Sequence, residues 1–270
     1  MNILEQFRLF TTLVIQFLTV FYAYQVIYIL ISIIKRKVTS LKDTDIRNRF
    51  AIFISARNEE GVISELLDSL NKQDYPRDKY DIYVVADNCT DHTAQVSRDN
   101  GAIVYERFNK EEVGKGYALN YLYTKVSSLK GRKYYDAFVV FDADNIVDPA
   151  FLKESNKKLA SGKYDAFTTY RNSKNFGTNW LSAAYSIWFL HEARHLNYVR
   201  DMIGAQCMIS GTGFVITSSL MDENDGWPYY FLTEDIQFSV ASTIRELAIA
   251  TAQCFMMNSH LRWNSLGSRD

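Results

Sequence analysis

The sequence has few of the residues that break or cross-link a chain. Its 270 residues include 3 prolines and 12 glycines, which argues against a linker-rich or disordered protein. The three cysteines, Cys89, Cys207 and Cys254, are far apart and form no CxxC pair, so they fit free thiols in a reducing compartment better than a disulfide framework. The net charge is only −1, and no global field therefore favours nucleic acid as a partner.

Hydrophobic residues are plentiful, and they are concentrated first at the N-terminus. They make up 47% of the chain, enough to bury a full-sized core. Between Phe7 and Ile34 the only charged residue is Arg8, and this run is long enough to cross the roughly 30 Å hydrocarbon core of a bilayer. We therefore predict a transmembrane helix over residues 7–34, in preference to a signal peptide or a buried core helix.

The flanks of this run predict its orientation. The run closes on Lys35-Arg36-Lys37, and these cations outweigh the single Arg8 on the other side. The positive-inside rule then predicts a cell-membrane protein with a single span in this chain. A polar linker at residues 35–49 and the rest of the chain are expected in the cytosol.

The following residues alternate between short apolar runs and amphipathic segments. The apolar runs predict strands at residues 50–55, 80–86, 102–105 and 137–141. The amphipathic segments predict helices at residues 60–71, 91–98 and 116–127. Strand and helix in alternation predict an α/β domain, in which helices cover both faces of a mostly parallel sheet. Ligands of such sheets bind at the carboxyl ends of the strands.

Three of the predicted strands end in polar clusters. These clusters are Ala56-Arg57-Asn58-Glu59-Glu60, Asp87-Asn88-Cys89-Thr90-Asp91 and Asp142-Ala143-Asp144. Parallel strands end at the same edge, so the clusters predict one crevice. An Asp-x-Asp segment after a buried strand offers oxygen ligands through which a divalent cation can bridge to a diphosphate. The predicted chemistry is sugar transfer from a nucleotide.

The order of the motifs makes a resemblance specific. After the three clusters, with Gly114-Lys115-Gly116-Tyr117-Ala118-Leu119-Asn120 between the second and third, come Ile209-Ser210-Gly211-Thr212-Gly213-Phe214 and Thr233-Glu234-Asp235-Ile236-Gln237. In this order they resemble the family 2 inverting glycosyltransferases of the membrane-bound, β-polysaccharide-synthase-like kind. The resemblance covers about residues 50–250. It implies a GT-A-like domain at residues 50–254.

The resemblance implies a nucleotide site in the first two clusters. Asp87 is expected to accept a hydrogen bond from the uracil ring of a UDP-sugar. Arg57 or Glu59 is expected beside the base or ribose, in the loop that starts at Ala56. A turn and helix cap at Asp87-Asn88 is the alternative interpretation, and it is compatible with the first.

The resemblance also implies a site for the donor sugar and its diphosphate. Asp142 is expected near the ribose and the sugar, and Asp144 on a Mg²⁺ or Mn²⁺ ion that holds the diphosphate. Lys115 precedes a predicted helix, so its ammonium is expected to face phosphate oxygens. An ordinary loop lysine is the alternative for that residue.

The Thr-Glu-Asp motif supplies the catalytic base in the family. By resemblance, Asp235 removes the proton from the acceptor hydroxyl as its oxygen attacks the anomeric carbon, and Glu234 belongs to the acceptor site. One displacement inverts the sugar and forms no covalent enzyme intermediate. The alternative is that Thr233, Glu234 and Asp235 only cap a helix that runs to Arg245.

The glycine-containing motif resembles the family's acceptor site. Gly211 and Gly213 let the backbone approach a sugar closely, Ser210 and Thr212 flank them, and Phe214 is expected to stack on a pyranose face. A tight turn between strands is the competing interpretation.

An aromatic helix is predicted at residues 180–198. We expect it to pack in the core, and a position at the membrane interface is the alternative. His191 and His195 lie at i and i+4 on it, but no companion carboxylate or cysteine completes a metal site, so a solvated or hydrogen-bonded pair is expected.

The C-terminal tail, residues 255–270, departs from the family. Members that extend a polymer carry a Gln-x-x-Arg-Trp segment and further membrane spans, whereas here Arg262-Trp263 follows Ser259 at the Gln position. The residues from Phe255 onward can be back-translated with permitted codons and then read one base out of phase. That reading can spell a sequence that resembles the family's usual continuation. We therefore hypothesise a truncated or frameshifted tail.

The sequence thus predicts a membrane-anchored, metal-dependent inverting glycosyltransferase. The expected donor is a UDP-sugar, UDP-glucose or UDP-N-acetylglucosamine, and the expected acceptor is a saccharide or a lipid. Membrane lipid is an expected partner and nucleic acid is not. The alternative is an inactive, truncated fragment that only binds sugar nucleotide.

Overall fold

The computed structural model describes residues 2–34, 43–173, 176–177 and 179–259. The strands are β1 (Phe50–Ala56), β2 (Tyr80–Asp87), β3 (Ile103–Arg107), β4 (Ala137–Asp142), β5 (Asn145–Ile146), β6 (Ala166–Ser173), β7 (Phe214–Thr217) and β8 (Ile249–Ser259). The helices are α1 (Ile3–Ile34), α2 (Ile63–Asn71), α3 (Thr93–Asp99), α4 (Lys115–Lys130), α5 (Phe151–Leu159), α6 (Trp180–His191), α7 (Tyr198–Met202), α8 (Ser218–Glu223) and α9 (Glu234–Ile244). A short 3₁₀ turn, η1 (Arg77–Lys79), precedes β2, and a π-helical turn, η2 (Glu192–Asn197), joins α6 to α7.

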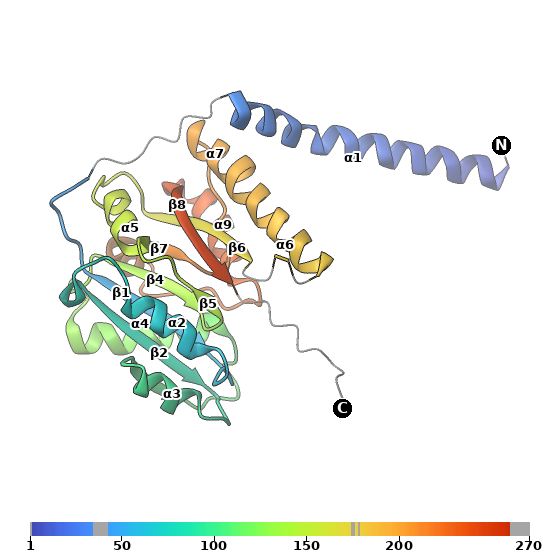
Figure 1. Ribbon diagram of the computed structural model, residues 1–270. Helices are drawn as coiled ribbons and strands as arrows, with labels where there is room; N and C mark the ends of the chain where they lie inside the picture. The colour runs from blue at the N-terminus through green and yellow to red at the C-terminus, as the bar shows by residue number, and fades with distance from the viewer. Residues whose placement is uncertain (1, 35–42, 174–175, 178, 260–270) are drawn as a thin grey trace.

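Within those ranges the strands form one eight-stranded sheet, in the order β3-β2-β1-β4-β7-β6-β8-β5. β7 and β5 run against their neighbours, and the other strands all share one direction. β1 lies between β2 and β4, with Ala56 beside Ala86 and Ser55 beside Asp142. The carboxyl ends of these three strands therefore meet at one edge, which confirms the predicted mostly parallel sheet (Figure 1).

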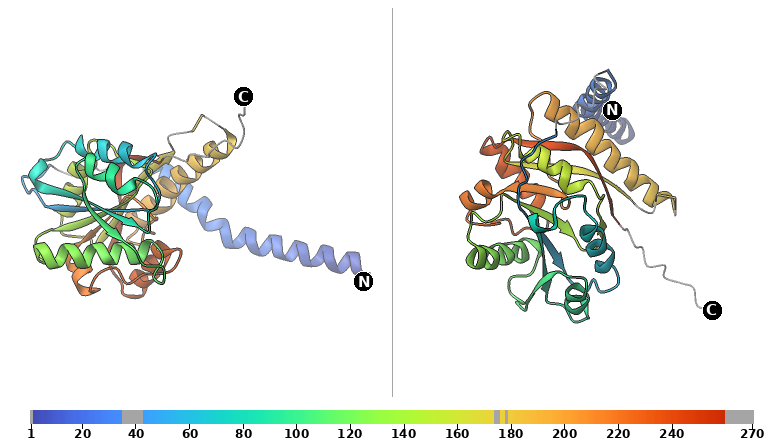
Figure 2. Two further views of the ribbon diagram at one scale, coloured as in Figure 1. Left: turned by 90° about the horizontal axis from the view of Figure 1, so that it is seen from below. Right: turned by 60° about the vertical axis from the view of Figure 1, so that its left-hand side comes forward.

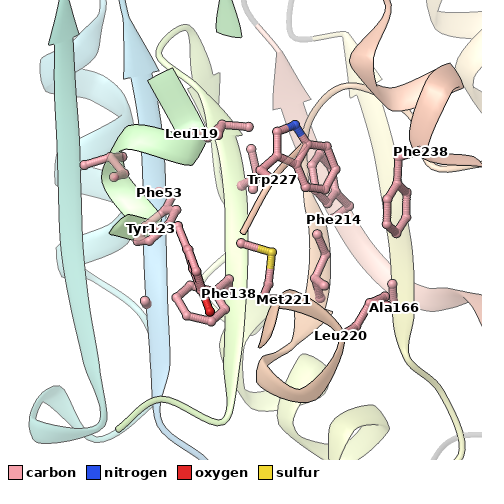
Figure 3. Packing of buried hydrophobic residues seen from close by; sticks show 14 of the residues in the cluster. Phe53, Leu119, Tyr123, Phe138, Ala166, Phe214, Leu220, Met221, Trp227 and Phe238 are labelled. Atoms are coloured by element: carbon pink, nitrogen blue, oxygen red, sulfur yellow. The ribbon is translucent and has the colours of Figure 1, made fainter. Parts of the chain in front are cut away.

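Different helices cover the two faces of the sheet, because successive side chains of a strand point to opposite sides. In β1, Ile52 and Ile54 pack with Leu66 of α2, whereas Phe53 packs in the second cluster with Leu119 of α4. Figure 3 shows this second cluster, in which residues of β4, β7, α8 and α9 join those of α4. Burying each large apolar side chain contributes about 1.5–3 kcal/mol, so the clusters hold both helical layers on the sheet.

Helix α4 packs very closely against the segment that leads into α9. A Cβ atom added at Gly116 would lie 1.8 Å from the carbonyl oxygen of Tyr229, so only glycine fits there. One residue later, the ring of Tyr117 stacks on Tyr230 with 4.3 Å between the centroids. These contacts fix Lys115, the first residue of α4, relative to the start of α9.

Helix α1 projects away from the body of the protein (Figures 1 and 2). Its 32 residues span about 48 Å at 1.5 Å per residue, and its most apolar window has a mean hydropathy of 2.1. Among the described residues, α1 is the one helix long and apolar enough to cross a membrane. Ser32, near its C-terminal end, is its one buried residue.

The predicted elements of residues 50–142 are confirmed, with ends that differ by at most three residues. The predicted linker lies partly at residues 35–42, and the tail partly at residues 260–270, both outside the described residues. Strand β8 continues past Cys254 to Ser259. The domain boundaries and the origin of the tail stay predictions.

The predicted aromatic helix is present as α6, η2 and α7, but the expectation that it packs in the core is wrong for α6. Leu196 of η2 and Val199 of α7 are buried, whereas Trp180 and Trp188 of α6 are 81% and 55% exposed. The periodicity of the segment is compatible with either position, because apolar residues lie on more than one side of α6.

The contact at Gly116 generates a prediction. Gly116→Ala should lower the free energy of unfolding by about 1–3 kcal/mol, because the new methyl group overlaps the Tyr229 carbonyl. Gly177→Ala is the matched control, since no atom of the described residues lies within 4 Å of a Cβ atom there. Thermal unfolding of both variants in detergent measures the difference. Equal midpoints for the two variants would contradict the close packing.

Candidate functional site

Two loops at the carboxyl edge of the sheet are joined by hydrogen bonds from backbone N–H groups to side-chain oxygens. The N–H group of Glu59 donates to Oγ1 of Thr93 at 2.7 Å, and the N–H group of Thr90 donates to Oδ1 of Asn58 at 2.8 Å. Asn58 and Asn88 have φ angles of 57° and 53°, the left-handed conformation that asparagine tolerates. The loops after β1 and β2 are therefore joined into one wall of the site at this edge of the sheet, and we call this site the crevice.

Asp87 lies at the end of β2 and is almost fully buried. Its Oδ1 atom accepts a hydrogen bond from Nη1 of Arg107 at 2.8 Å, and the two side chains are 5% and 6% exposed. Arg107 also donates to the carbonyl of Glu112 at 2.8 Å. Because a buried charge is stable only when it is paired, Arg107 holds Asp87 in place.

Acidic side chains converge beside this wall. Partial burial raises the pKa of Glu59, and the negative charges of Asp144, Asp142 and Asp91 raise it further. These residues come from the ends of β1, β2 and β4. The crevice thus gathers negative charge from three strands, a potential that attracts cations.

Two buried polar side chains fix the turn after β4 from the interior of the protein. The N–H group of Asp142 donates to Oγ1 of Thr212 at 2.9 Å, and that hydroxyl donates to Oδ1 of Asn145. Nδ2 of Asn145 donates in turn to Oδ1 of Asp144 at 3.0 Å. Thr212 and Asn145 are 4% and 1% exposed, so this chain of bonds sets the position of both aspartates from inside the protein.

Lys115 lies at the point where three of the sequence motifs meet. Its Nζ atom is 2.5 Å from Oδ1 of Asp142 and 3.6 Å from Oε1 of Glu234, and it donates to the carbonyl of Gly211. Burial alone would lower the pKa of Lys115, but the carboxylates of Asp142, Glu234 and Asp235 raise it above its ordinary value. Lys115 therefore stays a cation between the acidic residues of β4 and α9.

Asp235 lies in the first turn of α9 and faces the glycine motif. Its Oδ2 atom accepts from the N–H group of Gly211 at 2.7 Å, and its Oδ1 atom accepts from the N–H group of Ile236 at 2.8 Å. The side chain is half-buried. Glu234 points inward, is 5% exposed, and has a pKa raised by burial although Lys115 opposes the shift.

The structure brings together most of the predicted site residues. The crevice collects residues from both the predicted donor and acceptor groups: Glu59, Asp87, Lys115, Asp142, Asp144, Gly211, Glu234 and Asp235. Arg57 is exposed at the rim, and Ala56 is buried with its carbonyl accepting from Sγ of Cys89 at 3.4 Å. Their nucleotide contacts stay predictions.

Of the predictions for the glycine motif, the one for Phe214 is wrong. Phe214 is fully buried and stacks on Trp227, 5.6 Å between centroids, so it cannot stack on a sugar ring. Thr212 and Gly213 are also buried, Gly213 through a bond from its N–H group to the Val140 carbonyl at 2.8 Å. Phe214 begins β7, and the hydroxyl group of Thr212 braces the turn after β4. The acceptor contacts of Thr212 and Gly213 stay predictions. Ser210 and Gly211 stay at the surface of the crevice.

Sequence reasoning missed three supporting residues. Arg107 pairs with Asp87, Asn145 holds the turn after β4, and Arg171 of β6 donates to Oγ of Ser210. Only Asn145 had a signal, because it directly follows the Asp-x-Asp segment. The other two depend on β3 and β6 lying beside the site.

The carboxylate ligands at this site fit a cation that is also bound by a substrate. Among the described residues, no group of three or more histidine, cysteine or acidic side chains is arranged to hold a metal ion. Mg²⁺ and ions like it are often bound by one or two carboxylates together with phosphate oxygens. Asp144, with the negative charge that surrounds it, meets that requirement.

The Asp87–Arg107 pair generates a second prediction. Arg107→Met should lower the free energy of unfolding by about 3–5 kcal/mol, because it leaves a buried carboxylate without its partner. The matched control is Arg98→Met, which breaks the exposed pair with Glu106 and should cost about 1 kcal/mol or less. Chemical denaturation in detergent measures both. A cost for Arg107→Met as small as that of the control would show that Asp87 does not need its partner.

Comparisons with known proteins identify the family of this chain. A family model described as "Glycosyltransferase like family 2" matches residues 48–256. A β-monoglucosyldiacylglycerol synthase of Synechocystis sp. is 25% identical over 194 residues, which cover 70% of this chain and 39% of that protein. The chain therefore spans about two fifths of the length of such curated relatives.

Solved structures share the fold. A mannosyltransferase of Pyrobaculum calidifontis in complex with GDP-mannose and Mn²⁺ has a TM-score of 0.68 and 20% identity, over 93% of this chain and 68% of that chain. Residues 1–349 of TarS from Staphylococcus aureus, in complex with UDP-GlcNAc, have a TM-score of 0.58 and 18% identity, over 79% and 59% of the two chains. With a family model that matches most of its length, this chain belongs to the glycosyltransferase-like family 2, and it has a GT-A-like fold.

Proposed function

We propose that this chain is the catalytic part of a membrane-anchored, inverting glycosyltransferase that uses a UDP-sugar. The single observation that carries the proposal is the position of Lys115. It contacts Asp142 of the Asp-x-Asp segment, the Gly211 carbonyl and Glu234 beside Asp235. A donor anchored at Asp142 therefore lies next to a carboxylate that can take a proton.

In the proposed reaction, Asp235 is the general base. Its carboxylate accepts the proton of the acceptor hydroxyl while that oxygen forms a bond to the anomeric carbon and the bond to the nucleoside diphosphate breaks. The hydrogen bonds from the N–H groups of Gly211 and Ile236 orient the carboxylate for this task. Attack from the face opposite the leaving group inverts the configuration, so an α-linked donor gives a β-linkage.

The proposed donor site occupies the wall formed by the loops after β1 and β2. Asp87 and the neighbouring Arg57 or Glu59 would bind the base and ribose, with Asp142 near the sugar. Rigid pairing of Asp87 with Arg107 supports the assignment, because a fixed acceptor discriminates between bases better than a mobile one. A relative that makes β-monoglucosyldiacylglycerol and a neighbour with bound UDP-GlcNAc favour UDP-glucose or UDP-N-acetylglucosamine.

The proposed cofactor is Mn²⁺ or Mg²⁺, held by Asp144 and substrate phosphates. When bound, the ion would neutralise charge on the departing diphosphate. The neighbour with Mn²⁺ and GDP-mannose supports a divalent ion in this fold. The charge that raises the pKa of Glu59 supports it in this chain.

The proposed location is the cytosolic face of the cell membrane, with α1 as the span. The cations at residues 35–37 support that orientation. The proposed acceptor is a saccharide or a lipid, and the lipid product in the name of the Synechocystis relative favours the lipid.

A second candidate function is a fragment that binds sugar nucleotide without transferring the sugar. It is favoured by one observation, the two fifths of a relative's length that this chain covers. Additional segments that close over the acceptor would then be required for turnover.

The assignment of the base generates a prediction. Asp235→Asn should keep the fold and UDP-sugar binding but lower transfer about 100- to 10,000-fold, because the amide cannot accept the proton. Asp225→Asn is the control, since its side chain is 80% exposed and pairs only with Arg132 among the described residues. Product formation from radiolabelled UDP-sugars measures transfer. Turnover of Asp235→Asn at the rate of the control would remove the assignment.

The two candidate functions differ in UDP release. With membrane lipid as acceptor and Mn²⁺ present, an active enzyme should release UDP from one UDP-sugar in a panel that also contains GDP-sugars. Chelation by EDTA should abolish the release. A binding fragment should bind the same donor, measured by calorimetry, and release nothing. Metal-independent release would contradict the proposed cofactor.

A further inference from the structure

Helix α6 has an exposed apolar face that the glycosyltransferase site does not use. Trp180, Ile187 and Trp188 are 81%, 61% and 55% exposed, and Ala184 between them is exposed as well. Their spacing of i, i+4, i+7 and i+8 places them on one side of an α-helix. Exposed tryptophans on a continuous apolar face are rare on a surface that meets only water.

This face lies on the helix that leads into the segment contacted by α1. α6 continues directly into η2, and α1 packs against η2 and α7. Oγ of Ser32 and Nδ1 of His195 are 2.6 Å apart in a partly buried contact. Ser32 is near the C-terminal end of α1, the end that lies beside α7 in Figure 1. If α1 spans a bilayer, its C-terminal end lies at the bilayer surface, and α6 ends near that level, where it continues into η2.

The other side of the same helix is connected to the glycine motif through Arg171. The Cζ atom of Arg171 lies 4.3 Å from the ring centroid of Phe189, and its Nη2 atom is 3.5 Å from Oε2 of Glu192. Arg171 also donates to Oγ of Ser210, the residue before Gly211. The α6–η2 segment thus connects its exposed face to the loop that orients Asp235.

We propose that Trp180, Ala184, Ile187 and Trp188 insert into the headgroup region of the bilayer that α1 spans. This contact holds the glycine motif at the membrane surface. The inference rests on the proposed membrane anchoring by α1. Tryptophan is enriched at membrane interfaces, where its ring is apolar and its N–H group stays hydrated. The exposed Arg194 of η2 and the cations at residues 35–37 favour an anionic lipid surface over a protein partner.

The tryptophans of the chain allow a direct test. There are four, at residues 180, 188, 227 and 263, and α1 contains none. The full chain carrying Trp263→Phe is reconstituted into vesicles of phosphatidylcholine and phosphatidylglycerol, with acyl chains brominated near the headgroup. Trp227 is 1% exposed and should escape the quencher, so quenching reports on α6. We expect strong quenching that is mostly lost when Trp180→Phe and Trp188→Phe are added.

A control probe tests whether any exposed tryptophan would be quenched. Leu129→Trp, added to the triple phenylalanine variant, places a tryptophan at a residue that is 68% exposed on α4, across the body from α1 (Figure 1). Its emission should not respond to brominated lipid. Quenching equal to that of Trp180 and Trp188 would mean that the body adheres unspecifically, and it would overturn the proposal.

Flotation of the vesicles separates the remaining outcomes. A chain that floats with vesicles while Trp180 and Trp188 stay unquenched overturns the α6 contact and leaves the anchoring by α1 intact. If that emission instead changes with protein concentration, a second copy covers the face, which also overturns the lipid contact. A chain that does not float overturns the anchoring and this inference with it, although the transferase assignment would stand on its UDP release.

Discussion

The ammonium group of Lys115 is the contact on which the site depends. It lies among Asp142, Glu234 and Asp235, whose negative charges would repel one another without it. Two like charges 4 Å apart cost about 4 kcal/mol at the effective dielectric constant of a protein surface. The cation thus allows the turn that receives the donor and the helix that carries the proposed base to stand next to each other. Its own position depends on Gly116, which lets α4 approach the Tyr229 carbonyl.

A layer of buried polar side chains supports the residues that face the crevice. Arg107 fixes Asp87, while Thr212 and Asn145 fix the turn after β4. Each of these supports makes its bonds inside the protein, where a hydrogen bond is stronger and an unpaired group costs more than at the surface. The crevice can therefore keep several acidic groups close together before any ligand arrives. That preorganisation suits a reaction in which the protein mainly positions two substrates.

The sequence predicted strands β1 to β4 and the helices between them because the apolar runs of residues 50–142 alternate regularly with amphipathic segments. It did not predict strands β5 to β8. It also predicted which residues meet, since the polar clusters follow strands that must end at one edge. The sequence was less informative about the direction in which individual side chains point. In the glycine motif, Phe214 was expected to face a sugar, yet its ring completes the core under β7. For α6 it was expected that the aromatic rings would be buried, yet two tryptophans are exposed.

The sequence by itself therefore determined the fold class, the apolar N-terminal helix and the set of acidic residues at the strand ends, because these depend on local periodicity and on the order of motifs. Only the tertiary structure decided which side chains face the crevice and which support it from behind. Arg107 comes from β3 and Arg171 from β6, and nothing near them in the sequence indicates a partner. Their roles depend on the order of strands in the sheet, a long-range property that the pattern around a single residue does not contain.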